Sequence, residues 1–212
     1  MDNRTYFEDI VGLYLRDNTS FDAETLYLAA HNYPGCRDFA ITDADCAIIW
    51  QAINKKLKVD VASTEATKSC LVVNSSNGKI ESFAPDTYRL MSFTNEENCY
   101  LASKFVTSYK SPNLNLESHL ADLSYFWGGD GKLVPKFDCV ILESWDVYPY
   151  YKHIDGDFNM RQLLSKDYYI KRCMNMVNEG GLLITFLDEN DDLTWFDDIF
   201  SLKNKKLAIK YY

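Results

Sequence analysis

The sequence is poor in the residues on which most local catalytic motifs depend. Its 212 residues include only 9 glycines, 5 prolines and 3 histidines. The histidines, His31, His119 and His153, are too far apart for the spacing of a zinc site. No G-x-S-x-G, P-loop or H-E-x-x-H pattern is present. We therefore expect no metal centre, and the hydrolases and nucleotidases that carry those patterns are excluded.

Paired cysteines and long apolar runs are also missing. The 6 cysteines are scattered with no C-x-x-C pair, a pattern typical of buried, reduced thiols inside the cell. No apolar run approaches the roughly 20 residues that a membrane helix needs. The N-terminal stretch MDNRTYFEDI is too acidic and polar for a secretory signal. We expect a soluble, cytoplasmic protein without a membrane partner.

Basic residues are outnumbered by acidic ones. There are 22 Lys and Arg against 31 Asp and Glu, which gives a formal net charge of -9. Binding to nucleic acid through phosphate neutralisation is disfavoured, although a local basic groove would suffice for it. An acidic surface is better suited to a basic protein partner.

The first third of the chain has helical periodicity. Apolar residues at helical spacing predict a helix over Thr5–Arg16, and Thr19 or Ser20 is placed to cap a second helix that continues to Ala30. The stretch after Gly35 allows two interpretations. Either Arg37–Thr42 is a short strand and Ala44–Leu57 a helix, or the helix begins earlier and no strand forms.

The middle of the chain carries turn and helix signals. Two β-branched runs around Asn77-Gly78 predict a β-hairpin. The segments 95–109 and 111–127 both predict helices, the first with Asn95 as its cap.

The last third alternates strands and helices. Continuous apolar runs predict buried strands at Phe137–Leu142 and Leu182–Leu187, with a helix over Tyr168–Val177 between them. A short acidic helix over 188–200 and a final strand over 205–212 follow. This βαβ order predicts an α/β fold: a doubly wound, mostly parallel Rossmann-like sheet with an α-helical N-terminal segment. We expect one domain over 1–212, with a helical lead-in at 1–35 and the α/β core at 36–212.

An unusual mixture of acidic and aromatic residues follows the strand at Phe137–Leu142. Ligands of open α/β sheets bind beyond the carboxyl ends of the strands. The candidate site therefore contains the four residues after the strand and three tyrosines that could stack on a flat substrate: Glu143, Ser144, Trp145, Asp146, Tyr148, Tyr150 and Tyr151. The alternative is that these aromatic rings only pack against the helix that follows.

Two stretches resemble class I S-adenosylmethionine-dependent methyltransferases, in particular the amino-methylating enzymes of the adenine type. FDCVIL at Phe137–Leu142 is similar to the family's strand before its catalytic tetrapeptide, and NEGGLLITFL at Asn178–Leu187 is similar to its GG turn and next strand. DFAITDADCAII at Asp38–Ile49 is similar to the family's second strand, which ends in an acid that binds the cofactor ribose.

The resemblance implies S-adenosylmethionine as the cofactor and a nucleobase or an amino group as the methyl acceptor. It implies that Asp43, or Asp45 if the strand is longer, binds the ribose. It also implies that the acceptor side is lined by the catalytic candidates Glu143, Ser144, Trp145 and Asp146.

Two departures from the family pattern keep other functions open. No glycine-rich turn precedes residue 38, and ESWD replaces the family's Asn-Pro-Pro-Tyr. A methyltransferase-like protein that has lost catalysis, and binds a protein partner through its acidic and aromatic surface, is therefore an alternative. A weaker one is a nucleotide-sugar transferase, because Asp43-x-Asp45 is similar to the metal–nucleotide motif of those enzymes, although either acid could equally cap a helix.

Overall fold

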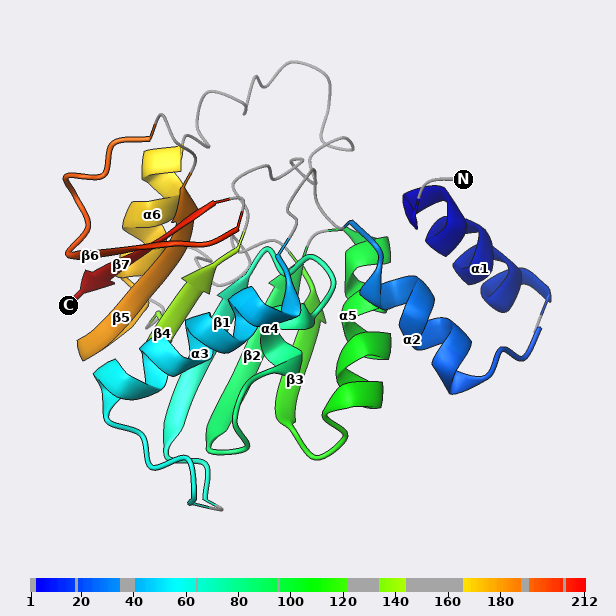
Figure 1. Cartoon of the computed structure of the whole chain (residues 1–212), viewed down its shortest axis with the longest axis horizontal. Coiled ribbons are helices and arrows are strands. Elements are labelled where there is room, and N and C mark those ends of the chain that lie inside the picture. Colours follow the sequence, from blue (N-terminus) through cyan, green and yellow to red (C-terminus); the bar gives the residue numbers. More distant parts are fainter. Residues whose placement is uncertain are drawn as a thin grey trace.

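The computed structural model describes residues 3–17, 19–34, 41–63, 65–94, 96–121, 134–143, 166–187, 191–203 and 205–212. Figure 1 shows a central twisted sheet with helices against both of its faces and a group of helices beyond one edge. In this part of the chain no helix is long and apolar enough to cross a membrane.

Seven strands form one sheet in the order β3-β2-β1-β4-β5-β7-β6. They are β1 (Lys68–Val73), β2 (Tyr88–Thr94), β3 (Asn115–Leu120), β4 (Phe137–Leu142), β5 (Val177–Leu187), β6 (Asp198–Ser201) and β7 (Lys206–Tyr211). The neighbouring strands from β3 to β5 are all parallel, whereas β7 is antiparallel to both β5 and β6. The predicted mostly parallel, Rossmann-like sheet is confirmed.

The strands β4 and β5 are direct parallel neighbours, with Ile141 opposite Ile184. Their side chains alternate between two cores, because successive residues of a strand point to opposite faces. Cys139 and Ile141 belong to the core under α3 (Asp43–Leu57), and Val140 and Leu142 belong to the core under α6 (Lys166–Met174). The continuous apolar pattern of β4 therefore has the predicted cause, which is that both faces are covered.

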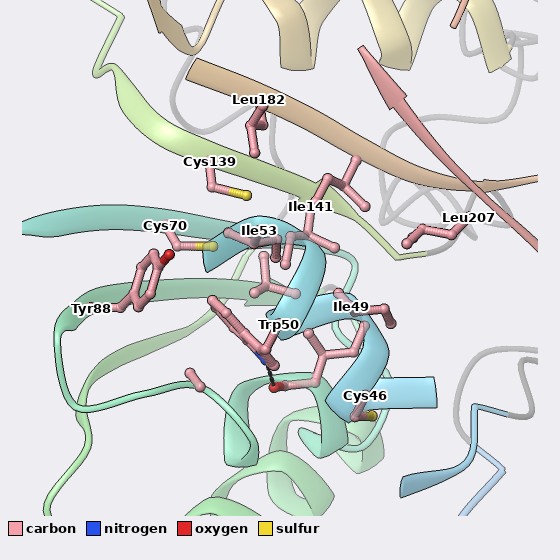
Figure 2. Packing of buried hydrophobic residues seen from close by; sticks show 14 of the residues in the cluster. Cys46, Ile49, Trp50, Ile53, Cys70, Tyr88, Cys139, Ile141, Leu182 and Leu207 are labelled. Carbon is pink, nitrogen blue, oxygen red and sulfur yellow. Dashed lines mark hydrogen bonds between the residues drawn. The ribbon is translucent and has the colours of Figure 1, made fainter. Parts of the chain in front are cut away.

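The core under α3 is the larger of the two. Ile49, Trp50 and Ile53 on α3 face Cys70 of β1 and Ile141 of β4, as Figure 2 shows. The indole nitrogen of Trp50 donates a hydrogen bond to the carbonyl of Ile80 at 2.6 Å, which satisfies the one polar atom of this buried ring.

The N-terminal helices form a third cluster beside the sheet. α1 (Asn3–Asp17) and α2 (Ala23–His31) pack on α5 (Glu97–Lys110), with Phe7, Tyr33 and Val106 among the buried residues. The predicted helix Thr5–Arg16 corresponds closely to α1. Tyr14 and Leu15, two of the apolar residues on which that prediction depended, are exposed. Asp22, and not Thr19 or Ser20, caps α2 by accepting a hydrogen bond from the Thr25 amide.

Some of the other predicted elements are confirmed, and others are wrong. Helix α5, helix α6 and strand β7 were predicted correctly in kind, although Val177 belongs to β5 and not to α6. The predicted hairpin at Asn77-Gly78 is wrong: β1 is followed by a turn and the four-residue helix α4 (Lys79–Ser82), and β2 then runs parallel to β1. Two predicted helices are also wrong, because residues 115–120 form β3 and residues 198–201 form β6.

Candidate ligand site at the sheet switch point

The chain reverses its direction of travel across the sheet between β1 and β4. From β1 it proceeds to β2 and β3, and from β4 it proceeds to β5 on the other side. The two strands are paired up to their carboxyl ends, where Val73 is opposite Leu142. The residues after these two ends, Asn74–Gly78 and Glu143, therefore meet at the switch point, which is where open α/β sheets bind ligands.

The turn after β1 is made from small polar residues. Asn74 and Gly78 both have positive φ, of 57° and 73°. The side-chain amide of Asn77 donates to the carbonyls of His31 and Tyr33, and its oxygen accepts from the amide of Lys79 at 3.2 Å. The turn is therefore tied to the end of α2. A Cβ added at Gly78 would lie 2.7 Å from Cα of Ser103, so this glycine permits the close approach of α5.

Glu143 joins the end of β4 to this turn. Its carboxylate accepts hydrogen bonds from the backbone amide of Ser76, at 3.1 Å, and from the Ser76 hydroxyl. The side chain is 2% exposed, and Glu81, which is close to it, is 0% exposed. Burial and the neighbouring charge of Glu81 raise the pKa of Glu143 to about 8, while Ser76 and Lys79 act in the opposite direction.

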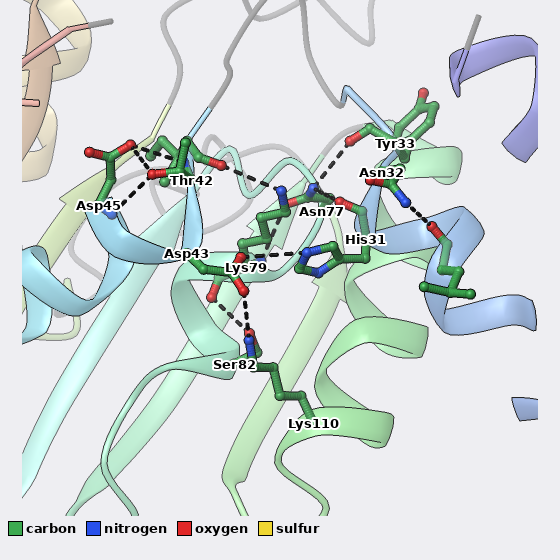
Figure 3. A network of polar contacts seen from close by, with 12 residues as sticks. His31, Asn32, Tyr33, Thr42, Asp43, Asp45, Asn77, Lys79, Ser82 and Lys110 are labelled. Atoms are coloured by element: carbon green, nitrogen blue, oxygen red, sulfur yellow. Dashed lines mark hydrogen bonds and ion pairs between the residues drawn. The ribbon is translucent and has the colours of Figure 1, made fainter. Parts of the chain in front are cut away.

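A pocket of about 440 Å³ opens beside the turn. Its wall consists of Asn3 from α1, the end of α2, the start of α3 and the turn itself: Asn3, His31, Asn32, Tyr33, Pro34, Ile41, Thr42, Asp43, Ser76, Asn77 and Lys79. Figure 3 shows how these segments converge. The volume is within the range of small-molecule sites.

The pocket wall carries charged and unsatisfied groups. Asp43 forms an ion pair with Lys110 at 3.2 Å and lies 3.5 Å from Nε2 of His31. Nδ1 of His31 is buried and has no hydrogen-bond partner. Burial, together with the charge of Lys79, lowers the pKa of His31, so its imidazole is neutral at pH 7. The ammonium of Lys79 contacts the carbonyl of Ile41 at 3.4 Å.

Helix α3 places Asp43 and Asp45 differently from the prediction. No strand reaches Asp43, because the described part of the predicted strand, Ile41 and Thr42, is irregular. Thr42 caps α3 in a capping box with Asp45, and the amide of Lys203 also donates to Asp45 at 3.4 Å. Asp43 lines the pocket, whereas Asp45 is occupied in fixing the helix end. The metal motif is not assembled, and no group of three or more metal-ligating side chains occurs among the described residues.

An acid that the sequence analysis missed follows β2. Glu96 comes two residues after the end of β2, and its Oε1 accepts from the Tyr33 hydroxyl at 2.8 Å and from Arg4 at 3.1 Å. It stands 18 residues after Gly78, close to the ~20-residue offset of the ribose-binding acid in dinucleotide folds. The available signal was an acid two residues after the partly apolar segment that forms β2. It was missed because the segment after Gly78, which forms α4, was interpreted as the second strand of a hairpin, and β2 was not predicted.

Most of the predicted acceptor side lies outside the described residues. This applies to Ser144, Trp145, Asp146, Tyr148, Tyr150 and Tyr151. Their roles as catalytic or stacking residues stay predictions, and of this group only Glu143 has a described position.

No protein-family model and no curated protein matches the sequence. Solved structures do match the fold. The O-methyltransferase TomG from Streptomyces achromogenes, solved with S-adenosylmethionine, has a TM-score of 0.55 at 11% identity, over 99% of this chain and 97% of its own. Human methyltransferase-like protein 13, solved with S-adenosylhomocysteine, has a TM-score of 0.53 at 12% identity, over 81% of this chain and 82% of its own.

A hypothetical protein from Thermus thermophilus also has a TM-score of 0.53, at 9% identity, over 78% of this chain and 83% of its own. Identities this low establish the architecture and leave the activity open. The strand order, the antiparallel β7 and these structural matches together show that the chain has a Rossmann-like α/β fold, which it shares with TomG and human methyltransferase-like protein 13.

Proposed function

We propose that the protein is an S-adenosylmethionine-dependent methyltransferase whose cofactor binds in the pocket beside the β1–α4 turn. The observation that carries the proposal is the chemistry of this pocket at the switch point. Lys79 supplies a cation, and His31 supplies a buried nitrogen without a partner. The presence of S-adenosylmethionine in TomG and of S-adenosylhomocysteine in human methyltransferase-like protein 13 supports the choice of ligand.

The residues of the pocket fit an amino acid joined to a nucleoside. Lys79 would pair with the carboxylate of the methionine portion, and Nδ1 of His31 would complete its hydrogen bonding with a polar atom of the ligand. Asp43 of the pocket wall, or Glu96, which lies beside the wall residue Tyr33, would accept from the ribose hydroxyls. When bound, the cofactor supplies the methyl group, and the task of the chain is to hold an acceptor in line with it. We propose a nucleobase or an amino group as that acceptor.

Lys79→Gln should weaken binding of S-adenosylhomocysteine about 10- to 150-fold, because a charge-assisted hydrogen bond contributes about 1.5–3 kcal/mol. Isothermal titration calorimetry on the full chain measures this directly. Glu97→Gln, at an exposed position of α5, is the control and should leave the affinity unchanged. Equal affinities of the Lys79 variant and the wild type would contradict this placement of the carboxylate.

The same titration decides which acid binds the ribose. If Glu96 has this role, Glu96→Gln should weaken binding by about 1.5–3 kcal/mol and Asp43→Asn should not. The reverse result would assign the ribose to Asp43, as the sequence resemblance implies. Circular dichroism must accompany both variants, because Glu96 also contacts Tyr33 and Arg4, and Asp43 contacts Lys110.

A second candidate function is supported by the side chains of the turn. The resemblance implies a glycine-rich turn, but Gly78 is the single glycine in the turn after β1, and Glu96 is already engaged by Tyr33 and Arg4. A chain with this fold and no cofactor would act as an interaction protein, and its net charge of -9 suits a basic protein partner. A folded protein that gives no heat with either S-adenosylmethionine or S-adenosylhomocysteine would favour this function.

A further inference from the structure

Two carboxylates are buried together beneath the β1–α4 turn. Glu81 of α4 is 0% exposed and Glu143 at the end of β4 is 2% exposed. Both oxygens of Glu143 accept hydrogen bonds from Ser76, but neither oxygen of Glu81 has a hydrogen-bond partner. The Ser75 hydroxyl is also buried and has no partner of ordinary hydrogen-bond geometry, but it lies close enough to Glu81 to lower the pKa of that acid, against the larger effect of burial, which raises it.

The surroundings do not neutralise this pair. In the part of the chain that the structure describes, neither carboxylate forms an ion pair. Lys79 of α4 is the cation that acts on Glu143, and it does so from the pocket side. Two buried thiols are close enough to interact with the pair: Cys46 of α3 with both carboxylates, and Cys70 of β1 with Glu81.

Two negative charges cannot both be kept in such a site. An ionised carboxylate that is buried without partners is far more costly than the neutral acid, and a second one nearby adds repulsion. We propose that Glu81 and Glu143 together hold one proton in the native state, and that this proton allows the two acids to stay buried between α4 and the end of β4 until alkaline pH removes it to solvent.

The sign of the pH dependence follows from where the proton is held. A glutamate in the unfolded chain has a pKa of about 4.3, whereas burial and mutual repulsion raise the native pKa of Glu143 to about 8. Below the unfolded value both states are protonated, so the pair causes no pH dependence there. As the pH rises from about 4.3 to about 8, only the native state keeps the proton, and stability falls.

The test is urea unfolding of the full chain between pH 5.5 and 7.5, in which Glu81→Gln is compared with the wild type. Glutamine keeps the shape of the protonated acid but cannot lose a proton. The variant should lack the contribution of about one proton. Between pH 5.5 and 7.5, its equilibrium constant for unfolding should therefore increase about 100-fold less than that of the wild type. The exposed control Glu97→Gln should follow the wild type. Parallel pH profiles for Glu81→Gln and the wild type would overturn the proposal.

A second measurement uses the unmodified protein, so it does not depend on the folding of a variant. Carbon NMR of glutamate side-chain carboxyls should show one group titrating well above pH 6 in the folded protein. If every glutamate titrates below about pH 5.5, the shared proton does not exist. Both measurements are made without a ligand, so their outcome is independent of cofactor binding. Ser76 of the turn lines the pocket, so loss of the proton, by disturbing the packing beneath the turn, would also lower the affinity for a ligand there. This consequence rests on the proposed function.

Discussion

Ile184→Ala should lower the free energy of unfolding by about 2–5 kcal/mol, because it removes three methyl or methylene groups from a site that cannot collapse. Ile184 is on β5, is 0% exposed, and is opposite Ile141 of β4 and Ile209 of β7. Neighbouring strands on both sides hold the backbone in place, so the cavity should persist.

Urea denaturation gives this free energy, with the slope m as a check that the transition stays two-state. Ile199→Ala is the matched control, since Ile199 is on the edge strand β6 and is 39% exposed. It should cost about 1 kcal/mol or less. Equal losses for the two variants would show that β5 is not at the centre of the core.

Gly78→Ala should lower the free energy of unfolding by about 2–5 kcal/mol, from two separate causes. The positive φ of 73° at this position adds about 1–2 kcal/mol for any residue with a Cβ. The new Cβ would also lie 2.7 Å from Cα and 3.0 Å from the carbonyl oxygen of Ser103, and overlap with backbone adds about 1–3 kcal/mol.

Gly180→Ala separates the two causes. Gly180 has a φ of 76°, but a Cβ added there would have nothing within 4 Å. This variant should therefore lose only the conformational part, about 1–2 kcal/mol. If thermal and urea unfolding show the same loss for both variants, the close approach between the β1–α4 turn and α5 does not constrain the fold.

Elements with a strong local signal were predictable from the sequence. The strands β4 and β5 have continuous apolar runs because both of their faces are covered, and helix α3 has apolar residues at helical spacing with a cap before them. The position of Glu143 at the carboxyl ends of the strands was predictable for the same reason, since Glu143 directly follows such a strand.

The elements that were mispredicted depend on partners far away in the chain. Asn77-Gly78 is a strong local signal for a hairpin. However, β1 pairs in parallel with β2 and β4, and these long-range pairings make the segment a strand followed by a turn and a helix. Strand β3 is a half-exposed edge strand with mostly polar residues, so its pattern does not distinguish it from a helix.

The amino-acid sequence thus determined the fold class through the burial of individual segments, and it supplied the acidic residues of the site. Only the tertiary structure decided how those acids are used. Glu143 meets Ser76 across 67 residues because the sheet order brings the ends of β1 and β4 together, and Glu96 meets Tyr33 across 63 because α2 packs on α5. A hydrogen bond between residues so far apart leaves no periodic trace in the sequence, since it depends on long-range strand pairing and helix packing and not on local propensity.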